Sequence, residues 1–335
     1  MKIEIVTAPN PGLMETGFGS VEACQNVLDS IAKSGFAVRL SICNSMEDLE
    51  NVVSRTPDLV ILAVKYIAIE NDADIWLSDF FSKRSINFSG SSKSALDYDS
   101  NKVMAKRHLQ KHGVRTADFF TAVPGQYRSA ANLPIPFPLF LKPLGAANGN
   151  GIDELSFVSD FLEFNQKVAS LYEIFQGPVL VEQYLDGREY TVAIIDSKSD
   201  GLLVSPVEII PAKSLNGLRI LGERAKKEDL EKLLRIEDPE QARKVSGVAV
   251  LAFRHLEVRD YGRIDIKTNR SGQVFFMKAN LVPGMSSGSS YFPRACQIDS
   301  GIPYDKMIQI ILKRCMVRTG KDSAIQDCRG VGWHR

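Results

Sequence analysis

The apolar run Asp58–Val64 (DLVILAV) constrains the fold more than any other stretch, because it offers no polar face to water. Such runs are typical of central strands in parallel sheets, which are buried on both sides. Shorter strands are expected at Lys2–Thr7 and Ala37–Ile42, and apolar residues recur at helical spacing between them. This β-α-β order predicts a doubly wound parallel α/β domain that ends near residue 93.

Composition narrows the class of protein. The chain has 335 residues, enough for two or three packed units. Its 41 lysines and arginines balance 40 aspartates and glutamates, so the net charge of +1 gives no bulk sign of nucleic-acid binding. We find no apolar stretch near the roughly 18 residues of a membrane span, and no signal-peptide layout. Five cysteines without CxxC spacing argue against zinc or disulfides, so we expect a cytoplasmic protein.

Lys142 stands at the end of an expected strand that starts at Pro138, and the glycine-containing loop Gly145–Gly151 follows at once. Burying an unpaired ammonium is costly, so a lysine here needs a partner. Backbone N–H groups of a glycine loop surround phosphate oxygens well, and a neighbouring lysine neutralises them. The alternative is an edge lysine that reaches past apolar surface to water.

Two glutamates, Glu182 and Glu189, flank an Asp-Gly pair between the expected strands Val179–Tyr184 and Tyr190–Ile195. An Asp-Gly pair between apolar runs predicts a hairpin. Carboxylates placed there can accept hydrogen bonds from the amine of a base and from sugar hydroxyls. An exposed turn held by a weak surface ion pair is the alternative.

A second hairpin is expected from Gly262–Lys267 and Gln273–Asn280. Arg263 and Asp265 are two residues apart, so they share a strand face. On the return strand, side chains again alternate between the two faces, so one face is expected to carry Phe276, Lys278 and Asn280. An aspartate and an amide oxygen can ligate Mg²⁺, and an arginine can stabilise charge that develops on a reacting oxygen. A surface network of Arg–Asp and Lys–Asp pairs remains open.

The histidines give little chemistry. His108 and His112 have i, i+4 spacing on an expected helix from Lys102 to His112. No acid lies nearby on this helix. Its other charged residues are all basic, namely Lys102, Lys106, Arg107 and Lys111. We therefore interpret this helix as a solvated basic face rather than a metal site.

Taken in order, these clusters resemble the D-alanine–D-alanine ligase family of the ATP-grasp superfamily. The matching segments are a lysine that opens a helix (Lys102), LKP with its glycine loop, EQYLDGRE, GRID and KANLVPGM. The similarity runs from about residue 87 to about residue 312. The resemblance implies an α/β fold of three units: residues 1–93, a central unit 94–185 and a C-terminal unit 186–320, followed by a polar tail 321–335.

The resemblance also implies that ATP lies between the central and C-terminal units. Phosphate contacts fall to Lys102, Lys142 and the loop glycines Gly149 and Gly151. The segment that holds adenine would be Glu182, Gln183, Tyr184 and Leu185, and Glu189 would bind ribose. A lysine for the γ-phosphate is expected in 213–227, where Lys226 and Lys227 are the favoured candidates.

The remaining roles concern metal and substrate. The resemblance gives Asp265 and Asn280 as Mg²⁺ ligands and Arg263 as the group that stabilises the tetrahedral oxyanion. Gly284 and the serine loop 286–290 would bind the substrate carboxylate through Ser287, Ser289 and Ser290. The acid that holds the first amine has no clear match, although Glu15 and Glu22 lie nearby. The candidate catalytic residues are Arg263, Lys278 and Gly284.

Lys278 departs from the family pattern, which has a metal-bridging glutamate at this place. The change alters the local charge by two units, and like charges ~4 Å apart repel by ~4 kcal/mol at an effective dielectric of ~20. Three outcomes are open. The ammonium stands in for one metal ion, another acid supplies the ligand, or the chain binds nucleotide without turnover.

These observations predict an ATP-dependent ligase that joins a small carboxylate, such as an amino acid, to an amine through an acyl phosphate. The alternative is an ATP-binding relative with lost or changed catalysis. An oxidoreductase of the dinucleotide-binding type is a third hypothesis, but Gly17-Phe18-Gly19 lacks the third glycine of its fingerprint. No nucleic-acid or membrane partner is expected. Family members are commonly dimers, which leaves a homodimer open.

Overall fold

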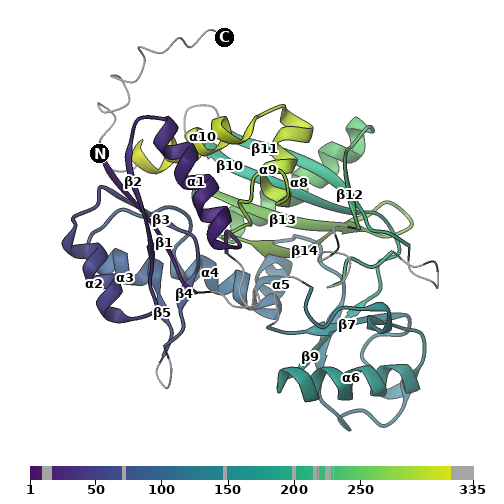
Figure 1. The fold of residues 1–335 in the computed structure, drawn as a ribbon. Helices are drawn as coiled ribbons and strands as arrows, with labels where there is room; N and C mark the ends of the chain where they lie inside the picture. Colours follow the sequence, from purple (N-terminus) through teal and green to yellow (C-terminus); the bar gives the residue numbers. More distant parts are fainter. Residues whose placement is uncertain are drawn as a thin grey trace.

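A computed structural model describes residues 1–9, 17–69, 73–145, 149–197, 201–213, 217, 219–222, 228 and 230–317 (Figure 1). Its N-terminal part has three parallel strands in the order β2-β1-β3, namely β2 (Ala37–Ile42), β1 (Lys2–Thr7) and β3 (Leu59–Leu62). Helix α1 (Val21–Lys33) packs on one face, and α2 (Met46–Ser54) and α3 (Leu77–Lys83) pack on the other. The expected doubly wound sheet is therefore confirmed. A short pair, β4 (Tyr66–Ile67) and β5 (Ile75–Trp76), accompanies it.

A four-stranded antiparallel sheet forms a separate lobe at the lower right of Figure 1. Its order is β6 (Phe119–Ala122), β9 (Val179–Gln183), β7 (Leu139–Pro143) and β8 (Phe157–Val158), with 3₁₀ turns at Ala130–Asn132 and Glu154–Ser156. Helix α6 (Phe161–Phe175) buries Phe164, Val168 and Leu171 against this sheet. Asp160 caps the helix by accepting a hydrogen bond from the backbone N–H of Glu163. The lobe thus has an apolar core of its own.

The largest sheet has five antiparallel strands in the order β12 (Lys232–Arg235), β11 (Gly201–Ile210), β10 (Glu189–Ser197), β13 (Tyr261–Thr268) and β14 (Val274–Asn280). It packs against α8 (Pro239–His255), α9 (Tyr291–Ser300) and α10 (Tyr304–Val317). Asp238 caps α8, and Pro239 occupies its first turn, where its missing N–H costs no hydrogen bond. Helices α4 (Lys93–Ser100) and α5 (Lys102–Lys111) pack against the edge strand β14.

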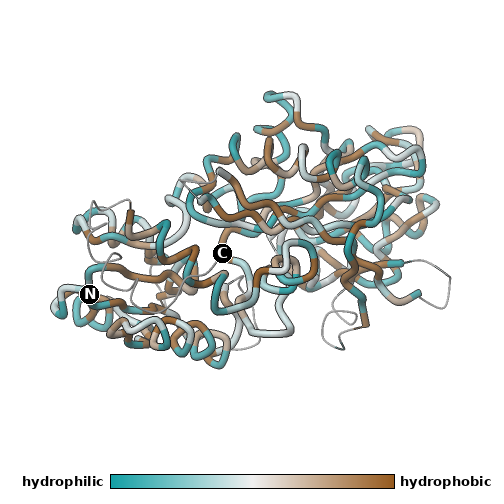
Figure 2. The backbone as a smooth tube through the Cα atoms, turned by 90° about the horizontal axis from the view of Figure 1, so that it is seen from above, coloured by the Kyte–Doolittle hydropathy of each residue, from teal (hydrophilic) through white to brown (hydrophobic). Residues whose placement is uncertain are grey.

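The main apolar core is continuous from the N-terminal sheet to the five-stranded sheet. It passes from β1 and β3 through α1 and α10 to β10 and β13. Figure 2 shows the hydrophobic stretches along these interior strands. No helix in the described ranges is long and apolar enough to cross a bilayer. The four-stranded lobe does not share this core. The four-stranded and five-stranded sheets therefore belong to two separate apolar cores.

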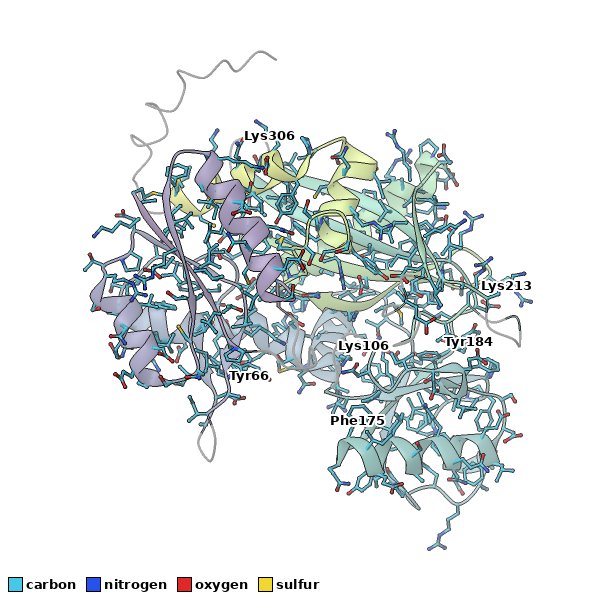
Figure 3. The ribbon with its side chains drawn as sticks, viewed as in Figure 1. Tyr66, Lys106, Phe175, Tyr184, Lys213 and Lys306 are labelled. Carbon is cyan, nitrogen blue, oxygen red and sulfur yellow. The ribbon has the colours of Figure 1, made fainter. Side chains whose placement is uncertain are left out.

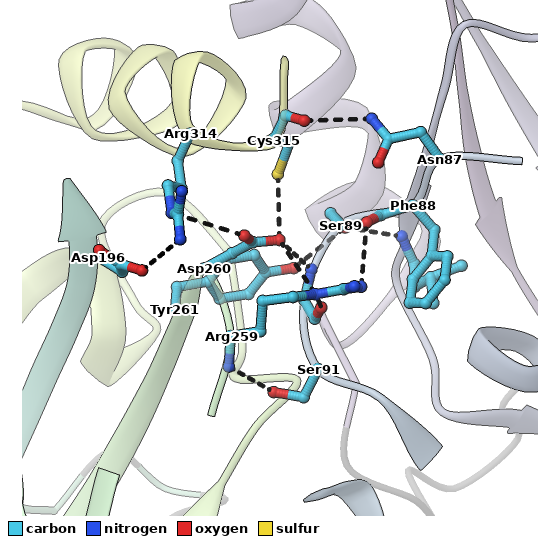
Figure 4. A network of polar contacts seen from close by, with 12 residues as sticks. Asn87, Phe88, Ser89, Ser91, Asp196, Arg259, Asp260, Tyr261, Arg314 and Cys315 are labelled. Atoms are coloured by element: carbon cyan, nitrogen blue, oxygen red, sulfur yellow. Dashed lines mark hydrogen bonds and ion pairs between the residues drawn. The ribbon is translucent and has the colours of Figure 1, made fainter. Parts of the chain in front are cut away.

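Polar contacts join the segment 88–91 to the start of β13 (Figure 4). The backbone N–H of Arg259 donates to Ser91 Oγ at 3.1 Å. The guanidinium of Arg259 donates to the carbonyl oxygen of Gly90. Asp260 is fully buried, and its Oδ2 accepts from Gly90 N at 2.8 Å and from Cys315 Sγ at 3.4 Å. The N-terminal part is thereby fixed to the five-stranded sheet by hydrogen bonds as well as by the shared core.

The predicted hairpin around the Asp-Gly pair is wrong. Strand β9 belongs to the four-stranded sheet and β10 to the five-stranded sheet, so residues 184–188 cross between the two sheets. Gly187 is required for close approach rather than for a tight turn, because a Cβ there would lie 2.6 Å from the carbonyl oxygen of Thr268. Its own N–H donates to that oxygen at 3.0 Å.

The second predicted hairpin is confirmed, but one face assignment in it is wrong. The register shifts between Asp265 and Ile266, which leaves Met277 as the extra residue of a β-bulge. Phe276 therefore lies opposite Ile266 and joins the main core instead of sharing the face of Lys278. Beyond the bulge the face of Asp265 continues with Phe275, which lies opposite Lys267.

Candidate nucleotide site

Glu182 lies between two lysines where the four-stranded sheet meets α5. Its Oε1 is 2.7 Å from Lys106 Nζ, and its Oε2 is 2.6 Å from Lys142 Nζ. All three residues are buried, with Lys106 and Glu182 almost completely shielded from water. Figure 3 shows Lys106 at the junction of the large sheet and the smaller lobe. Glu182 is therefore the ion-pair partner that a buried Lys142 was expected to need.

Charge keeps Glu182 ionised despite its burial. Burial by itself raises the pKa of this carboxyl, but the attraction of Lys106 and Lys142 outweighs burial and lowers the pKa to about 2. The carboxylate thus stays charged between the Lys106 and Lys142 side chains in the interior. Its position on β9, next to Lys142 on β7, follows from the antiparallel register of those two strands.

The interpretation of α5 as a solvated basic face holds for Arg107, Lys111 and His112, which are exposed, but is wrong for Lys106. Lys106 points into the protein, and His108 is half-buried, with its ring 4.8 Å from that of Tyr98 and 4.4 Å from that of His112. Sequence reasoning missed Lys106 as a site residue. The available signal was its spacing, because Lys106 lies one turn after Lys102 and therefore on the same helix face.

Lys102 begins α5 and reaches the same region. Its Nζ donates to the carbonyl oxygen of Leu144, just after β7, at 2.8 Å. Burial, with repulsion from Lys142 and Lys278, lowers the pKa of Lys102 to about 7. The structure therefore brings together the two lysines predicted to contact phosphate. Both candidate glycines of the adjoining loop, Gly149 and Gly151, have positive φ, and residues 146–148 lie outside the described part.

The four polar residues of the β13–β14 hairpin come together as predicted. Arg263 lies opposite Asn280, and Asp265 lies opposite Lys278. Asp265 Oδ1 accepts from Thr191 Oγ1 at 2.7 Å and is 3.2 Å from Arg263 Nε. Its Oδ2 is 3.5 Å from Lys278 Nζ. The guanidinium of Arg263 also lies over the ring of Tyr291, whose hydroxyl donates to the buried Glu231.

The two predicted metal ligands fit a divalent cation only in part. Asn280 Oδ1 is buried and accepts no hydrogen bond from the described residues, as expected of an oxygen reserved for a ligand. Asp265 supplies one carboxylate, which already contacts two cationic side chains. Within the described ranges, no group of three or more acidic, histidine or cysteine side chains could hold a metal. These ligands suit one ion whose remaining ligands are phosphates and water.

An apolar patch adjoins the polar groups where the two sheets meet. It contains Ala117, Leu185 and Phe275, with Met277 packed against them. Tyr184 is half-buried against Phe157, with ring centroids 4.7 Å apart (Figure 3). This patch offers flat apolar surface of the kind that a base stacks on. Gln183 is exposed, and Glu189 Oε2 is 3.5 Å from Lys267 Nζ.

The predicted substrate loop is held against the beginning of α1. The Met285 N–H donates to the Phe18 carbonyl at 3.0 Å, and the Ser287 N–H donates to Asn26 Oδ1 at 2.9 Å. A Cβ at Gly284 would lie 2.7 Å from Ser290 Oγ, so a side chain at this position would displace the Ser290 hydroxyl. Ser289 is exposed at the tip of the loop, and Glu22 is exposed in the first turn of α1. The candidates Glu15, Lys226 and Lys227 lie outside the described residues.

The family model described as D-ala D-ala ligase C-terminus matches residues 109–313, which is more than half of the chain. The chain belongs to the D-alanine–D-alanine ligase family. The D-alanine–D-alanine ligase of Aquifex aeolicus is 26% identical over 229 residues, covering 68% of this chain and 73% of its own length. An uncharacterized protein of Sinorhizobium fredii is 27% identical over 239 residues, and the match spans slightly less than two thirds of it, 66%.

Solved structures of D-alanine–D-alanine ligases share the fold. A crystal structure of the Bacillus anthracis enzyme complexed with ATP superposes with a TM-score of 0.73 at 21% identity, covering 96% of this chain and 99% of that one. A second structure of that enzyme gives a TM-score of 0.72. The ATP-grasp fold and the family resemblance read from the motifs are thus confirmed.

Proposed function

We propose that this protein is an ATP-dependent ligase that joins a small carboxylate to an amine. The observation that carries the proposal is the pairing of two clusters across the junction of the sheets. Lys102 and Lys142 lie on one side, and Arg263, Asp265 and Asn280 lie on the other. Cations suited to phosphate thus face a group that can hold a metal and stabilise an oxyanion.

The chemistry needs activation of a poor acyl donor. A carboxylate oxygen attacks the γ-phosphorus of ATP, the bond from that phosphorus to the β-phosphate oxygen breaks, and ADP leaves. The acyl phosphate that results is attacked at its carbonyl carbon by an amine. The amine loses a proton, the carbon–oxygen bond to phosphate breaks, and inorganic phosphate leaves with an oxygen from the carboxylate.

Some residues of this chain would bind the nucleotide and Mg²⁺, and Arg263 would stabilise charge that develops during the reaction. Lys102 and Lys142 would bind phosphate oxygens, and the patch around Leu185 and Phe275 would receive the base. Arg263 would stabilise the oxyanion formed when the amine adds. Asp265 and Asn280 would hold Mg²⁺, which when bound offsets phosphate charge.

The substrate is proposed to be an amino acid. The loop after β14 lies against the first turn of α1, so the carboxylate and the amine of a small molecule would meet groups from both segments. Ser287, Ser289 and Ser290 are the candidates for the carboxylate, and Glu22 is a candidate for the amine. Stereochemistry would be decided by the same loop.

A phosphate-release assay over pairs of D- and L-amino acids tests the proposal. We expect ADP and phosphate only when ATP, Mg²⁺ and a suitable pair are all present, together with a product whose mass equals the sum of the pair less one water. Arg263→Met should abolish this product while nucleotide still protects the protein against heat. Normal ATP binding without ADP from any mixture would contradict the proposal.

That last outcome would favour a second candidate function, nucleotide binding without ligation. The specific observation behind it is Lys278, which contacts Asp265 where a metal ligand would otherwise help to orient the phosphates. Lys278→Glu distinguishes the two candidates. A gain of ATP turnover on this change would identify the wild-type protein as the inactive form, and a loss would identify Lys278 as part of a working site.

A further inference from the structure

Lys278 lies beside the two candidate metal ligands, Asp265 and Asn280. Its Nζ is 3.5 Å from Asp265 Oδ2, and the two residues are direct cross-strand neighbours. Counted from the turn, where Thr268 pairs with Val274, a regular register would place Met277 opposite Asp265, and the bulge at Met277 places Lys278 there instead. The side chain of Lys278 is about one quarter exposed, and its charge lies close enough to Lys102 to help lower the pKa of that lysine.

The oxygen ligands beside Lys278 suffice for a single ion. Asp265 contributes a carboxylate and Asn280 an unclaimed amide oxygen. In the ranges that the structure describes, no three acidic, histidine or cysteine side chains form a cluster that could hold a metal. Two divalent ions held close together need carboxylates to offset their mutual repulsion. Here two cationic side chains, from Arg263 and Lys278, surround the one carboxylate instead.

Fixed positive charge is also abundant on the opposite side. Around Lys102 and Asp265, the cations of Lys102, Lys106, Lys142, Arg263 and Lys278 outnumber the carboxylates of Asp99, Glu182 and Asp265. Two further carboxylates, of Glu189 and Glu231, lie near Tyr291 on the other side of Arg263, and Glu189 is paired with Lys267. Such an excess of cations in a half-buried site is unfavourable unless a polyanion binds there. A triphosphate with a single divalent ion supplies the missing negative charge.

We propose that this site binds its nucleotide with one divalent cation, held by Asp265 and Asn280, and that the Lys278 ammonium takes the electrostatic place of a second. The inference rests on the proposed nucleotide function and specifies how it works. Lys278 contacts phosphate through its charge, so it binds nucleotide and not metal. A glutamate at this position would turn the same place into a metal ligand.

Counting manganese tests the inference without turnover. Mn²⁺ is titrated by electron paramagnetic resonance into protein that is in excess over a non-hydrolysable ATP analogue, so that all the nucleotide is bound. We expect one Mn²⁺ per bound nucleotide in the wild type and two in Lys278→Glu. Lys278→Met should keep one Mn²⁺ and bind the analogue roughly tenfold more weakly, equivalent to the loss of one charged contact.

Lys313→Glu is the matched control, because it makes the same charge change on an exposed lysine of α10. It should behave as the wild type. Two Mn²⁺ in the wild type would overturn the inference even if Lys278→Glu failed to fold, and so would a count of one in a folded Lys278→Glu. Absence of analogue binding in the wild type is a different result, because it would contradict the proposed function itself.

Discussion

Lys106 is completely buried beside Glu182. Burial lowers the pKa of the Lys106 ammonium, and the attraction of Glu182 opposes that shift. The two groups are 2.7 Å apart, and neither has appreciable contact with water. A buried ion pair contributes little net stability compared with apolar residues of similar volume. Removal of one partner, however, leaves the other charge unpaired in the low-dielectric interior. The arrangement therefore makes Lys106 a positioning residue, which holds Glu182 and through it Lys142.

Lys106→Met should lower the free energy of unfolding by about 3 kcal/mol, the cost of breaking a buried ion pair. It should also weaken nucleotide binding, because Lys142 then holds Glu182 alone and is drawn away from phosphate. Urea denaturation and analogue titration measure the two effects. Lys111→Met, an exposed change on the same helix, should alter both by little. Equal behaviour of the two variants would refute the positioning role.

Lys102 makes nucleotide binding depend on pH. Burial and its lysine neighbours lower the pKa of Lys102 to about 7, so above pH 7 the free protein carries it mostly neutral. Bound phosphate stabilises the charged form and raises the pKa again. Binding at pH 8 should therefore take up a proton, and affinity should fall as pH rises above 7.

Calorimetry of analogue binding at pH 8, in two buffers with different ionisation enthalpies, measures this proton. Lys102→Arg should abolish the uptake, because a guanidinium stays charged at this pH. If the observed heat is the same in both buffers for the wild-type protein, Lys102 does not contact the phosphates.

Among the elements, the crossing between β9 and β10 depends on Gly187. An alanine there would place its Cβ against Thr268 Oγ1 and 2.6 Å from the Thr268 carbonyl. We expect Gly187→Ala to lower the free energy of unfolding by about 2 kcal/mol, as overpacking does. Gly247→Ala is the contrasting control, since it lies exposed inside α8 with nothing within 4 Å, and it should stabilise by up to about 1 kcal/mol. Denaturation curves in urea measure both changes, and equal effects would show that the crossing is not constrained.

The elements also show what sequence alone can predict. Periodicity located the strand that carries Arg263 and Asp265 and the strand that carries Lys278 and Asn280, because these signals are local. The Asp-Gly pair gave a wrong hairpin prediction. In the sequence, a glycine that allows close approach to a distant strand cannot be distinguished from a glycine in a tight turn. The bulge at Met277 and the burial of Lys106 depend on partners far along the chain, which a one-sequence pattern does not encode.

At the scale of the whole molecule, the joint in Figure 4 sets how the N-terminal part meets the large sheet. Asp260 has a positive φ of 65° and accepts from Gly90 N, with Arg314 Nε 3.9 Å away. Asp260→Ala should lower the free energy of unfolding by about 3 kcal/mol, because it leaves buried donors unpaired and strains the backbone.

Asp260→Asn should cost less than the alanine variant, since an amide oxygen still accepts from Gly90 and asparagine tolerates positive φ. The substrate loop and α1 lie on the two parts that this joint connects. The alanine variant should therefore also raise the KM for the amino acid more than that for ATP. Equal stability of the two variants would argue against the joint as a constraint.

The most direct test of the account is the fate of a carboxylate oxygen. The amino acid that supports phosphate release is labelled with heavy oxygen in its carboxylate, and the inorganic phosphate is analysed by mass spectrometry after one reaction cycle. The account predicts one labelled oxygen in each phosphate, because the acyl phosphate passes that atom to the leaving group. Unlabelled phosphate would contradict it.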